Sequence, residues 1–440
     1  MILPLALNQK RLKQEVERQL DDMLATGIVQ ESNSPMASPL VCVLKGRGGC
    51  DGVRLAVDYR YVNSFTVGDA FPISDIEDVI QRVGGKRFIS TFDCRQGYYQ
   101  TRVCDRNRWL TAFVCMGRLL EFVRTPFGLK NAGQTFVRAM HSILRQIREF
   151  TDSYIDDCAV FSDGWHDHLE HLDKYLSTMR HEHITINLKK CRFGQHSVKF
   201  CGEIIGSGTR SPDPEKVAAV KEIAVPETKK QLRGMLGFFS YFRKHIKSFA
   251  DKAKVLTDLT SKRVPQNIKS VWTDKHSEAL RDLKDELIRT CNEPLYIVRF
   301  DRPFHVYVDA SSYAVAGYVV QCDDAGVEHP VAFFSSKLSA SQTNWSTIER
   351  EAYAALLAVK KYREWLFGSK IIIHSDHNPL TFLTESAPKS SKLVRWNLAL
   401  AEYNIEFKYH PGKLNTAADS LSRPGPEVAA DQSVGIVTGC

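Results

Sequence analysis

Apolar residues recur with two different periods along this chain, and the period changes from segment to segment. Short apolar runs between glycine, proline or polar residues predict strands, and apolar positions three or four residues apart predict helices. In the first half, we expect strands at 40–44, 53–59 and 87–92, a β and turn region over 97–103 and 110–113, and two β runs within 153–161. Helices are expected at 11–28, 73–83, 132–147 and 166–183.

The pattern changes after a cluster of glycine, serine and proline at 206–214, which predicts a domain boundary. Two helices are expected next, at 214–223 and 229–249. Residues 304–424 then alternate strands with helices, as in an α/β or α+β domain. We expect strands at 304–308, 314–321, 330–335, 370–375 and 403–409, a long helix at 347–366, and a last helix after these strands.

Length and composition exclude several classes of protein. The chain has 440 residues, 43% of them hydrophobic and 25% charged, which predicts about three domains and excludes a wholly disordered chain. No apolar run approaches the roughly 18 residues of a membrane helix, so no membrane partner is expected. Eleven cysteines are scattered without a C-x-x-C pair. This favours a reducing, intracellular compartment over a disulfide framework or a zinc site.

Positive charge is concentrated in one segment. Residues 207–290 contain 18 Lys and Arg against 11 Asp and Glu, a balance of +7 in a chain whose net charge is +8. Such a segment is suited to the phosphates of a nucleic acid, with Lys229, Lys230 and Arg233 as candidate contacts. From charge alone, a solvated lysine-rich helical face remains an equal alternative.

Three carboxylates follow strand ends in the first half. Asp93 ends the run at 87–92, and Asp156 and Asp157 lie between two short β runs, at the expected tip of a hairpin. Neighbouring acids repel each other, and hard oxygen ligands bind Mg²⁺ well. Three carboxylates from two strand ends therefore suit two metal ions in phosphoryl transfer. Taken alone, an Asp-Asp pair is more often an ordinary turn.

Four more acids fall on separate elements of 304–424. Asp309 and Asp376 end β runs, Glu351 lies on the long helix, and Asp419 lies on the last helix. Four carboxylates on four elements suit two Mg²⁺ ions and the cleavage of a phosphodiester.

The long helix offers two glutamates for this second group. Ser346 and Glu349 have the spacing of a capping box, which gives Glu349 a structural role. Glu351 instead borders the apolar stripe of the helix beside Ala352 and Ala355. We therefore expect Glu351 rather than Glu349 to join the other acids.

Seven sequence blocks occur in a fixed order along the chain. They are SPMASP (34–39), VDYR (57–60), FD (92–93), QGY (96–98), PFGLKNA (126–132), YIDD (154–157) and PDPEK (212–216). This order resembles the reverse transcriptases of gypsy-class LTR retrotransposons, which are relatives of retroviral polymerases. The resemblance covers nearly the whole chain and implies a polymerase with fingers, palm and thumb.

The resemblance also implies roles for single residues. Asp93 and Asp156 look like the metal ligands, and Asp157 looks like a less direct third acid. Tyr98 falls where the family places an aromatic ring under the nucleotide sugar. Arg54 resembles the fingers residue that contacts the incoming triphosphate, and Lys190 resembles the lysine near the leaving pyrophosphate. For Arg54 and Lys190, an ordinary solvated side chain is the alternative.

The sequence departs from the family pattern at a few positions. Gly133 stands where proline is usual, Cys201 stands where leucine is usual, and the fingers loop 46–52 has an unusual composition. These departures bear on rate and fidelity more than on reaction type, because no carboxylate is lost.

The C-terminal part resembles the ribonuclease H domain of the same retroelements. The blocks that carry the resemblance are DAS (309–311), FSSKL (334–338), EAYAA (351–355), SDHNPL (375–380) and ADSLSR (418–423). All four acidic positions, Asp309, Glu351, Asp376 and Asp419, are filled. His410 is either a loop histidine that assists turnover or a plain surface histidine. His374 and His377 flank Asp376 and are interpreted as bystanders, because harder oxygen ligands fit Mg²⁺ better.

We therefore expect an α/β and α+β multidomain protein, a right-hand polymerase followed by a ribonuclease H-like mixed-sheet domain. The expected domains are fingers and palm at 1–206, a basic helical thumb and connection at 207–295, the ribonuclease H-like domain at 296–424, and a tail or linker at 425–440. Protease and integrase signatures are absent, which predicts the middle of a Pol polyprotein.

The expected activity is RNA-directed DNA polymerase fused to ribonuclease H, with Mg²⁺ as cofactor and Mn²⁺ able to substitute. Expected partners are an RNA template, a DNA primer, the RNA/DNA hybrid and dNTPs, in a cytoplasmic retroelement particle. Two alternatives stay open. A decayed copy would only bind nucleic acid, and an RNA-dependent RNA polymerase would share the palm acids without explaining residues 304–424.

Overall fold

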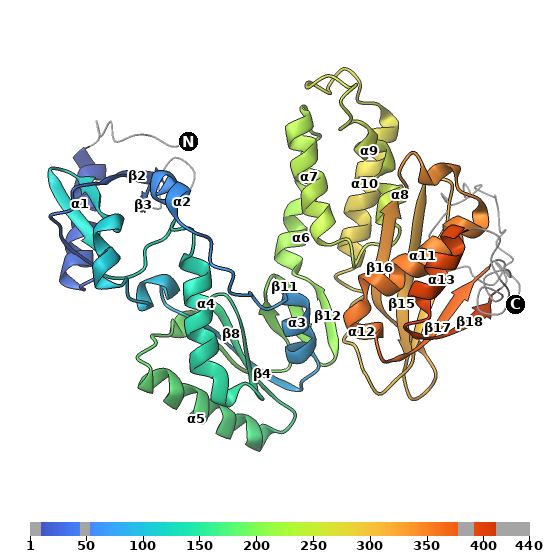
Figure 1. The fold of residues 1–440 in the computed structure, drawn as a ribbon, viewed down its shortest axis with the longest axis horizontal. Helices are drawn as coiled ribbons and strands as arrows, with labels where there is room; N and C mark the ends of the chain where they lie inside the picture. Colours follow the sequence, from blue (N-terminus) through green and yellow to red (C-terminus); the bar gives the residue numbers. More distant parts are fainter. Residues whose placement is uncertain (1–9, 45–52, 377–390, 411–440) are drawn as a thin grey trace, which may run out of the picture. The chain divides into compact units, whose positions relative to one another are not determined.

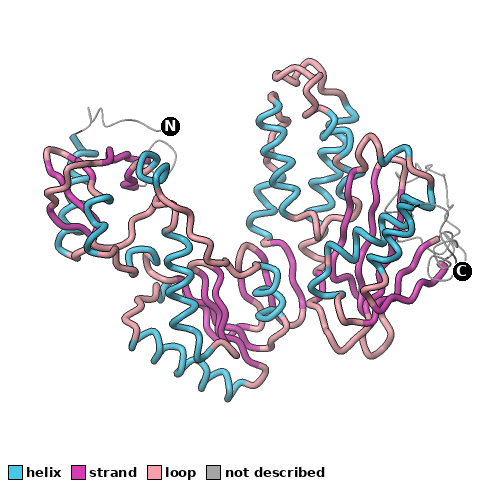
Figure 2. Tube along the Cα trace, viewed as in Figure 1, coloured by secondary structure: helices cyan, strands magenta, loops and turns pink. Residues whose placement is uncertain are grey.

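The computed structural model describes residues 10–44, 53–376 and 391–410. The chain forms two compact units, one of residues 1–201 with 205–208 and the other of residues 202–204 with 209–440. Each unit combines helices with β-sheet (Figure 1, Figure 2), so the expected mixed α/β class is confirmed.

A five-stranded sheet near the N-terminus, the N-terminal sheet, has the order β1-β6-β5-β2-β3. Its strands are β1 (Val29–Glu31), β2 (Ser38–Leu44), β3 (Val53–Val57), β5 (Phe113–Cys115) and β6 (Arg118–Phe122). The predicted β2–β3 hairpin is present, with Leu40 opposite Val57, while its loop lies outside the described residues. Helix α1 (Lys10–Ala25) buries Val16 and Leu20 in the core of this sheet.

A second, four-stranded sheet in the same unit, the central sheet, has the order β7-β8-β4-β9. Its strands are β4 (Phe88–Asp93), β7 (Thr151–Tyr154), β8 (Asp157–Ser162) and β9 (Arg192–Gln195). Strand β8 pairs on both sides and is buried over 158–162, which explains its continuous apolar run. Its core includes Phe136 from α4 (Ala132–Ile143) and Tyr175 from α5 (Trp165–His181).

The remaining elements of this unit are short. They are helices α2 (Arg60–Phe65) and α3 (Ile76–Gly84), strand β10 (Val198–Phe200), and the 3₁₀ helices η2 (Gly97–Gln100), η3 (Asp105–Thr111), η4 (Leu144–Ile147) and η5 (Leu188–Lys190). The expected β and turn region at 97–103 begins with the 3₁₀ helix η2, and its β structure is limited to an isolated bridge between Arg102 and Arg124. Gln96 has a φ of 52°, in the left-handed region, and this residue turns the backbone out of the line of β4.

The second unit begins with a short sheet and a group of helices, which we call the helical layer. Strands β11 (Glu203–Gly206), β12 (Thr209–Pro212) and β13 (Leu295–Tyr296) are consecutive in this sheet. The helical layer consists of α6 (Pro214–Lys221), α7 (Lys229–Tyr241), α8 (Phe249–Lys252), α9 (Lys254–Asp258) and α10 (Asp274–Arg289). The helix expected at 229–249 ends earlier, at Tyr241, and a turn leads to α8.

The rest of this unit is a five-stranded sheet with the order β16-β15-β14-β17-β18, the C-terminal sheet. Its strands are β14 (Phe304–Ala310), β15 (Ala314–Cys322), β16 (Glu328–Lys337), β17 (Lys370–Ser375) and β18 (Asn404–Tyr409). Each of the five strands expected in this region is present. The pairing of β14 with β17 is parallel and needs a crossover, which contains α11 (Thr347–Lys361).

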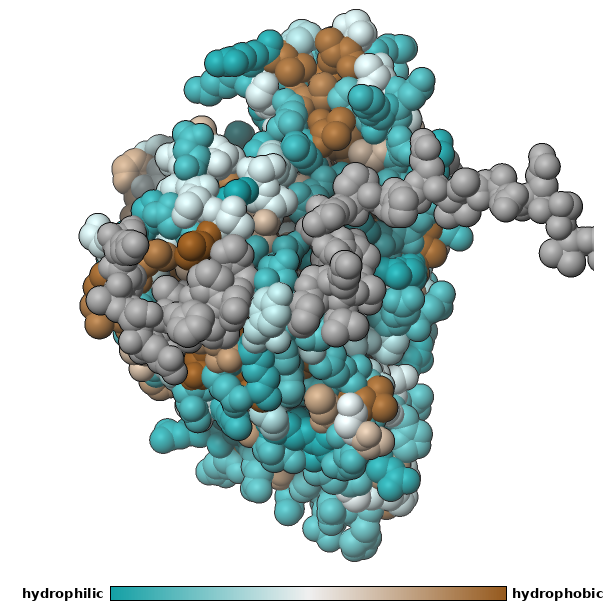
Figure 3. Space-filling view, turned by 90° about the vertical axis from the view of Figure 1, so that its right-hand side faces the viewer, coloured by the Kyte–Doolittle hydropathy of each residue, from teal (hydrophilic) through white to brown (hydrophobic). Residues whose placement is uncertain are grey.

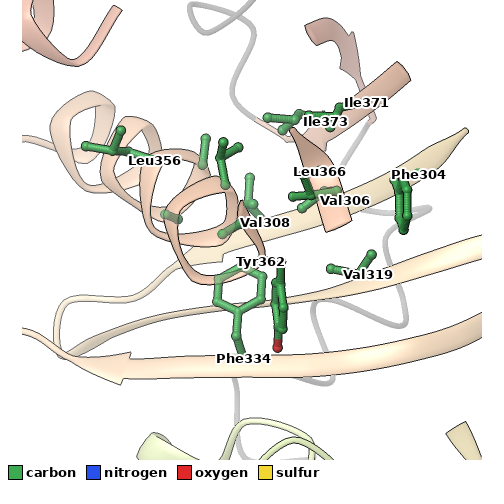
Figure 4. Packing of buried hydrophobic residues seen from close by; sticks show 14 of the residues in the cluster. Phe304, Val306, Val308, Val319, Phe334, Leu356, Tyr362, Leu366, Ile371 and Ile373 are labelled. Atoms are coloured by element: carbon green, nitrogen blue, oxygen red, sulfur yellow. The ribbon is translucent and has the colours of Figure 1, made fainter. Parts of the chain in front are cut away.

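Helix α11 packs its apolar side on the C-terminal sheet. Figure 4 shows Leu356 of this helix above Val308 and Phe334, with Ile371 and Ile373 further along the sheet. The expected long helix is interrupted at Tyr362, whose φ and ψ of −109° and 32° separate α11 from α12 (Arg363–Leu366). Helix α13 (Ser391–Leu400) was not expected and adds Trp396 to this core.

One face of the molecule is largely polar. Figure 3 shows one face on which hydrophilic residues predominate and hydrophobic residues occur in small groups. Within the part of the chain that the structure describes, no helix has the length and apolar character needed to cross a bilayer.

Candidate active sites

The three acids of the first half lie together at one end of the central sheet. Asp93 is the last residue of β4 and pairs with Asp157, the first residue of β8. Asp156 lies in the tight turn between β7 and β8, after Ile155, whose φ is 54°. The turn therefore brings Asp156 and Asp157 of the β7–β8 hairpin beside Asp93, which ends the neighbouring strand β4.

Crowding and burial perturb these carboxylates. Burial and the charge of Asp93 raise the pKa of Asp156, while Lys190 opposes the shift. Burial, Asp93 and Asp156 raise the pKa of Asp157. Among the described residues, the buried Oδ1 of Asp156 has no hydrogen-bond partner. A carboxylate group with an unused oxygen and excess negative charge fits a divalent cation.

Lys190 and Tyr98 border this group of acids. The ammonium of Lys190 donates a hydrogen bond to Asp93 Oδ2 at 3.0 Å. The ring of Tyr98 packs 5.0 Å from that of Phe127, and burial with the charge of Asp156 raises the pKa of its hydroxyl. The structure thus brings two of the three predicted nucleotide-binding residues to the acids.

Arg54 is placed elsewhere in the unit. It lies on β3 of the N-terminal sheet, opposite Val43, with an exposed side chain. Within the described part of the chain it makes no ion pair with Asp93, Asp156 or Asp157. Its predicted contact with a triphosphate therefore depends on a ligand that bridges the two sheets.

The second group of acids lies at one end of the C-terminal sheet. Asp309 is near the end of β14, and Asp376 directly follows β17, its parallel neighbour. Glu351 comes from α11, and its Oε1 accepts a hydrogen bond from the backbone amide of Ala310 at 3.0 Å. Three separate elements therefore bring three of the four predicted acids together.

Glu351 is the most perturbed of these acids. Its side chain is only 3% exposed, and burial together with the charges of Asp309 and Asp376 raises its pKa to about 9. Within the described ranges, its buried Oε2 has no hydrogen-bond partner. A buried carboxyl with an orphaned oxygen beside two other acids fits a cation site.

The alternative glutamate of α11 is occupied elsewhere. The predicted capping box is present, with Ser346 and Glu349 as its two partners. Glu349 also forms an ion pair with Lys392 at 3.2 Å. These contacts account for Glu349 structurally and leave Glu351 as the glutamate beside Asp309.

Two of the residues expected near this site lie outside the described residues, namely Asp419 and His377. His410 is described, and its backbone amide donates a hydrogen bond to the carbonyl of Ser375 at 2.9 Å. This bond places His410 beside the residue that precedes Asp376. Its ring lies edge-on to that of His374, 6.0 Å away. Burial, followed by the charges of His305 and His410, lowers the pKa of His374 to about 4.

Neither group of acids already forms a set of metal ligands. Over residues 10–44, 53–376 and 391–410, no three His, Cys, Asp or Glu side chains converge closely enough to hold a metal ion. A cation would therefore have to draw the carboxylates together, which would relieve their mutual repulsion.

One predicted nucleic-acid contact was wrong. Lys229 is 2% exposed, and its ammonium donates to the carbonyl of Ser261 at 2.7 Å, because the loop after α9 passes over the start of α7. It therefore cannot reach a phosphate. Lys230 is exposed, as are Lys262 and Arg263 in the same loop, while Arg233 donates to the carbonyl of Thr260 at 3.1 Å.

One acid near the second group was missed. Asp251 of α8 is half-buried, and its charge interacts with that of Asp309. Nothing in the sequence around it signals a site, because the relationship arises only when α8 packs on the C-terminal sheet.

Two family models match the chain. Residues 43–205 match the family described as reverse transcriptase (RNA-dependent DNA polymerase), and residues 299–403 match the RNase H-like domain found in reverse transcriptase.

Curated relatives resemble almost the whole chain. The Retrovirus-related Pol polyprotein from transposon opus of Drosophila melanogaster is 36% identical over 427 residues, which cover 95% of this chain and 42% of that protein. The Pol polyprotein from transposon gypsy of the same organism is 32% identical over 93% of this chain and 40% of its own length. The chain thus spans less than half the length of these relatives.

Solved structures share the fold. The foamy viral protease-reverse transcriptase dRH in complex with ds DNA matches with a TM-score of 0.81 and 23% identity, over 91% of this chain and 70% of that one. The foamy viral protease-reverse transcriptase in complex with RNA/DNA hybrid matches with a TM-score of 0.75 and 24% identity, over 98% and 57%. The predicted resemblance is thus confirmed: the chain carries a reverse transcriptase domain and the RNase H-like domain found in reverse transcriptases, and it is similar to the Pol polyproteins of gypsy-class retrotransposons.

Proposed function

We propose that the chain is an RNA-directed DNA polymerase that extends a DNA primer with dNTPs on an RNA template, joined to a ribonuclease H that cleaves the RNA strand of the hybrid. The observation that carries the proposal is the presence of two separate groups of crowded carboxylates. Asp93, Asp156 and Asp157 form one, and Asp309, Glu351 and Asp376 form the other. Similarity to longer Pol polyproteins supports a role in retrotransposon replication, beside protease and integrase domains.

Both proposed activities need divalent cations, Mg²⁺ or in its place Mn²⁺. Asp93 and Asp156, with Asp157 as a less direct third acid, would hold them for polymerisation. Asp309, Glu351, Asp376 and Asp419 would hold them for hydrolysis. Bound cations would activate the attacking oxygen and stabilise charge on the leaving oxygen.

Other side chains would bind and orient the substrates. The ammonium of Lys190, which donates a hydrogen bond to Asp93 in the structure, would donate to the leaving pyrophosphate. Tyr98 would abut the sugar of the incoming nucleotide. Arg54 would pair with the triphosphate through its forked guanidinium. In this proposal residues 1–206 are fingers and palm, 207–295 are thumb and connection, 296–424 are the ribonuclease H, and 425–440 are a tail or linker.

Paired substitutions test whether the two sites are separate. Asp156→Asn should abolish extension of oligo(dT) on poly(rA) and leave cleavage of an RNA/DNA hybrid intact, while Asp376→Asn should do the reverse. Loss of one ligand of a two-metal site lowers the rate by orders of magnitude. Circular dichroism and thermal unfolding check that each variant is folded. If a folded variant lost both activities, the two-site proposal would be wrong.

The same assay separates an enzyme from a copy that only binds nucleic acid. A binding-only protein would retain the hybrid in a filter-binding assay and show neither extension nor cleavage with Mg²⁺ or Mn²⁺. That combination would refute both proposed activities.

A further inference from the structure

The helical layer reaches the face of the C-terminal sheet that carries Asp309. The backbone amide of Ala250, in α8, donates to Ser335 Oγ on β16 at 3.0 Å. Two further contacts fasten this layer to the same strand, from Phe333 N to the carbonyl of Lys244 at 2.9 Å and between Lys337 and Asp258 at 2.8 Å. Helix α8 is therefore fixed over β16 rather than lying free beside it.

The register of the sheet shows what lies under α8. Ser335 is directly opposite Ala316 on β15, and Ala316 is directly opposite Asp309 on β14. Directly opposite residues of antiparallel strands point to the same face, so these three side chains form one row across three strands. The row spans roughly 10 Å, because neighbouring strands lie about 4.8 Å apart.

Asp251 follows Ala250, and its carboxylate is close enough to Asp309, at the far end of this row, for the two charges to interact. The small side chain of Ala316 leaves room in its middle, between the anchor at Ser335 and the acid at Asp309. Asp251 is half-buried, and within the described part of the chain its carboxylate forms no ion pair. Burial and then the charge of Asp309 raise its pKa to about 6, against the opposing effect of Lys254.

Another side chain indicates a ligand at the same centre. Glu351 is 3% exposed, and its Oε1 is fixed on the amide next to Asp309. Its Oε2 is buried without a hydrogen-bond partner among the described residues. This Oε2, close to Asp309, needs either a proton or a cation as its partner. The additional negative charge of Asp251 near Asp309 strengthens the preference for a cation.

We propose that Asp251 is a further carboxylate of the nuclease centre beside Asp309, Glu351 and Asp376, supplied by the helical layer, and that its charge strengthens the binding of a divalent cation beside Asp309. The inference deepens the proposed ribonuclease H function and rests on it. It makes the centre composite, because Asp309, Glu351 and Asp376 come from the RNase H-like part of the chain and Asp251 comes from the segment before it.

Mn²⁺ binding to the full chain tests the proposal. Asp156→Asn and Asp157→Asn are combined first, so that the palm acids do not contribute, and binding is measured by isothermal titration calorimetry. Asp251→Asn should then weaken Mn²⁺ binding roughly tenfold, as is typical of residues that support metal ligands. Asp251→Glu should restore most of the affinity. Asp282→Asn is the matched control, because Asp282 is an exposed acid on α10 of the same layer, and it should change the affinity less than about twofold.

Hybrid cleavage gives a second readout that a merely structural role would not move. Asp251→Asn should raise the Mg²⁺ concentration for half-maximal cleavage and leave the rate at saturating Mg²⁺ nearly unchanged. If Asp251→Asn left the Mn²⁺ affinity unaltered, or if it stimulated cleavage at low Mg²⁺, the proposed role of Asp251 would be overturned while the nuclease centre itself would stand. If Glu351→Gln also left Mn²⁺ binding unchanged, the proposed nuclease centre itself would be overturned.

Discussion

Gly97 approaches the carboxylate of Asp156 so closely that a side chain at its position would displace that carboxylate. A β-carbon on Gly97 would lie 2.8 Å from Asp156 Oδ1 and 3.0 Å from the ring of Phe136. Phe136 belongs to the core under the central sheet and cannot move freely. The missing side chain of Gly97 therefore leaves room for a proposed metal ligand.

Gly97→Ala should lower the rate of DNA synthesis at least roughly tenfold, because the new methyl group displaces the Asp156 carboxylate while overpacking costs about 1–3 kcal/mol. Hybrid cleavage should be unchanged. Primer extension and hybrid cleavage on the same preparation measure both effects.

The matched control is Gly133→Ala, in the first turn of α4. Its β-carbon would lie 3.7 Å from the Tyr98 hydroxyl, an ordinary contact, so synthesis should persist and stability should rise by up to about 1 kcal/mol. Equal losses of synthesis in the two variants would mean that the contact with Asp156 is not the cause.

Tyr98 should exclude ribonucleotides by its ring. The ring is held 5.0 Å from that of Phe127 and 6.0 Å from that of Phe136, and within the described residues its hydroxyl forms no hydrogen bond. Removing a steric conflict of about 1–3 kcal/mol should raise rNTP relative to dNTP incorporation by roughly 5- to 150-fold in Tyr98→Ala. Tyr98→Phe, the control, should keep the selectivity of the parent in single-nucleotide extension. Undiminished selectivity in an active Tyr98→Ala would exclude the steric role.

Exposed charges near the start of α7 should control the salt dependence of duplex binding. Lys230, Lys262 and Arg263 are exposed, and each phosphate contact contributes about −0.9 to the slope of log affinity against log salt for B-form DNA. Replacing all three with glutamine should flatten the slope and weaken binding to all sequences alike. Lys229→Gln should instead destabilise the fold, because Lys229 is buried on Ser261. A slope unchanged in the triple variant would place these residues outside the interface.

Buried His168 should make the central sheet sensitive to acid. Its ring lies between Ser90 Oγ at 2.8 Å and Ser162 Oγ at 3.0 Å. Burial, then the charge of His171, lowers its pKa. The unfolded chain therefore binds a proton more readily, so the free energy of unfolding should fall as pH drops below about 6.5. Thermal unfolding between pH 8 and pH 5 should show a smaller loss in His168→Gln than in the parent.

Glu351 should destabilise the metal-free protein at high pH. Its pKa rises from 4.5 to about 9 on folding, so the stability contributed by its protonated form is present below pH 4.5 and is lost as pH approaches 9. Glu351→Gln should therefore unfold at a higher temperature than the parent at pH 8 without metal, and at a similar temperature near pH 4.5. Mg²⁺ should stabilise the parent more than the variant. The opposite order at pH 8 would contradict burial of an uncompensated charge.

Local patterns in the sequence were enough to predict most of the elements and the grouping of the acids. Asp93, Asp156 and Asp376 end or adjoin β runs, and the ends of paired strands lie together. The choice of Glu351 over Glu349 also followed from local rules, since the capping box occupies one side of α11.

Features that depend on tertiary packing could not be predicted in this way. The left-handed backbone at Gln96 leads into η2 within the expected β and turn region, although glutamine carries no turn signal. A charge count cannot distinguish buried Lys229 from exposed Lys230, because the loop that covers Lys229 is more than 30 residues away. The position of Asp251 over Ala316 likewise depends on how α8 packs on the sheet.

The parallel pairing of β14 with β17 determines when the nuclease acids meet during synthesis of the chain. Phe304 pairs with Ile371, so everything from β15 to α12 must leave the ribosome before these strands join. Such distant pairings form slowly, because the chain loses entropy before the contacts compensate for it. Strands β4 and β8, which carry Asp93 and Asp157, pair within the part made first. In a nascent chain, Asp93 and Asp157 would thus come together well before Asp376 reaches Asp309.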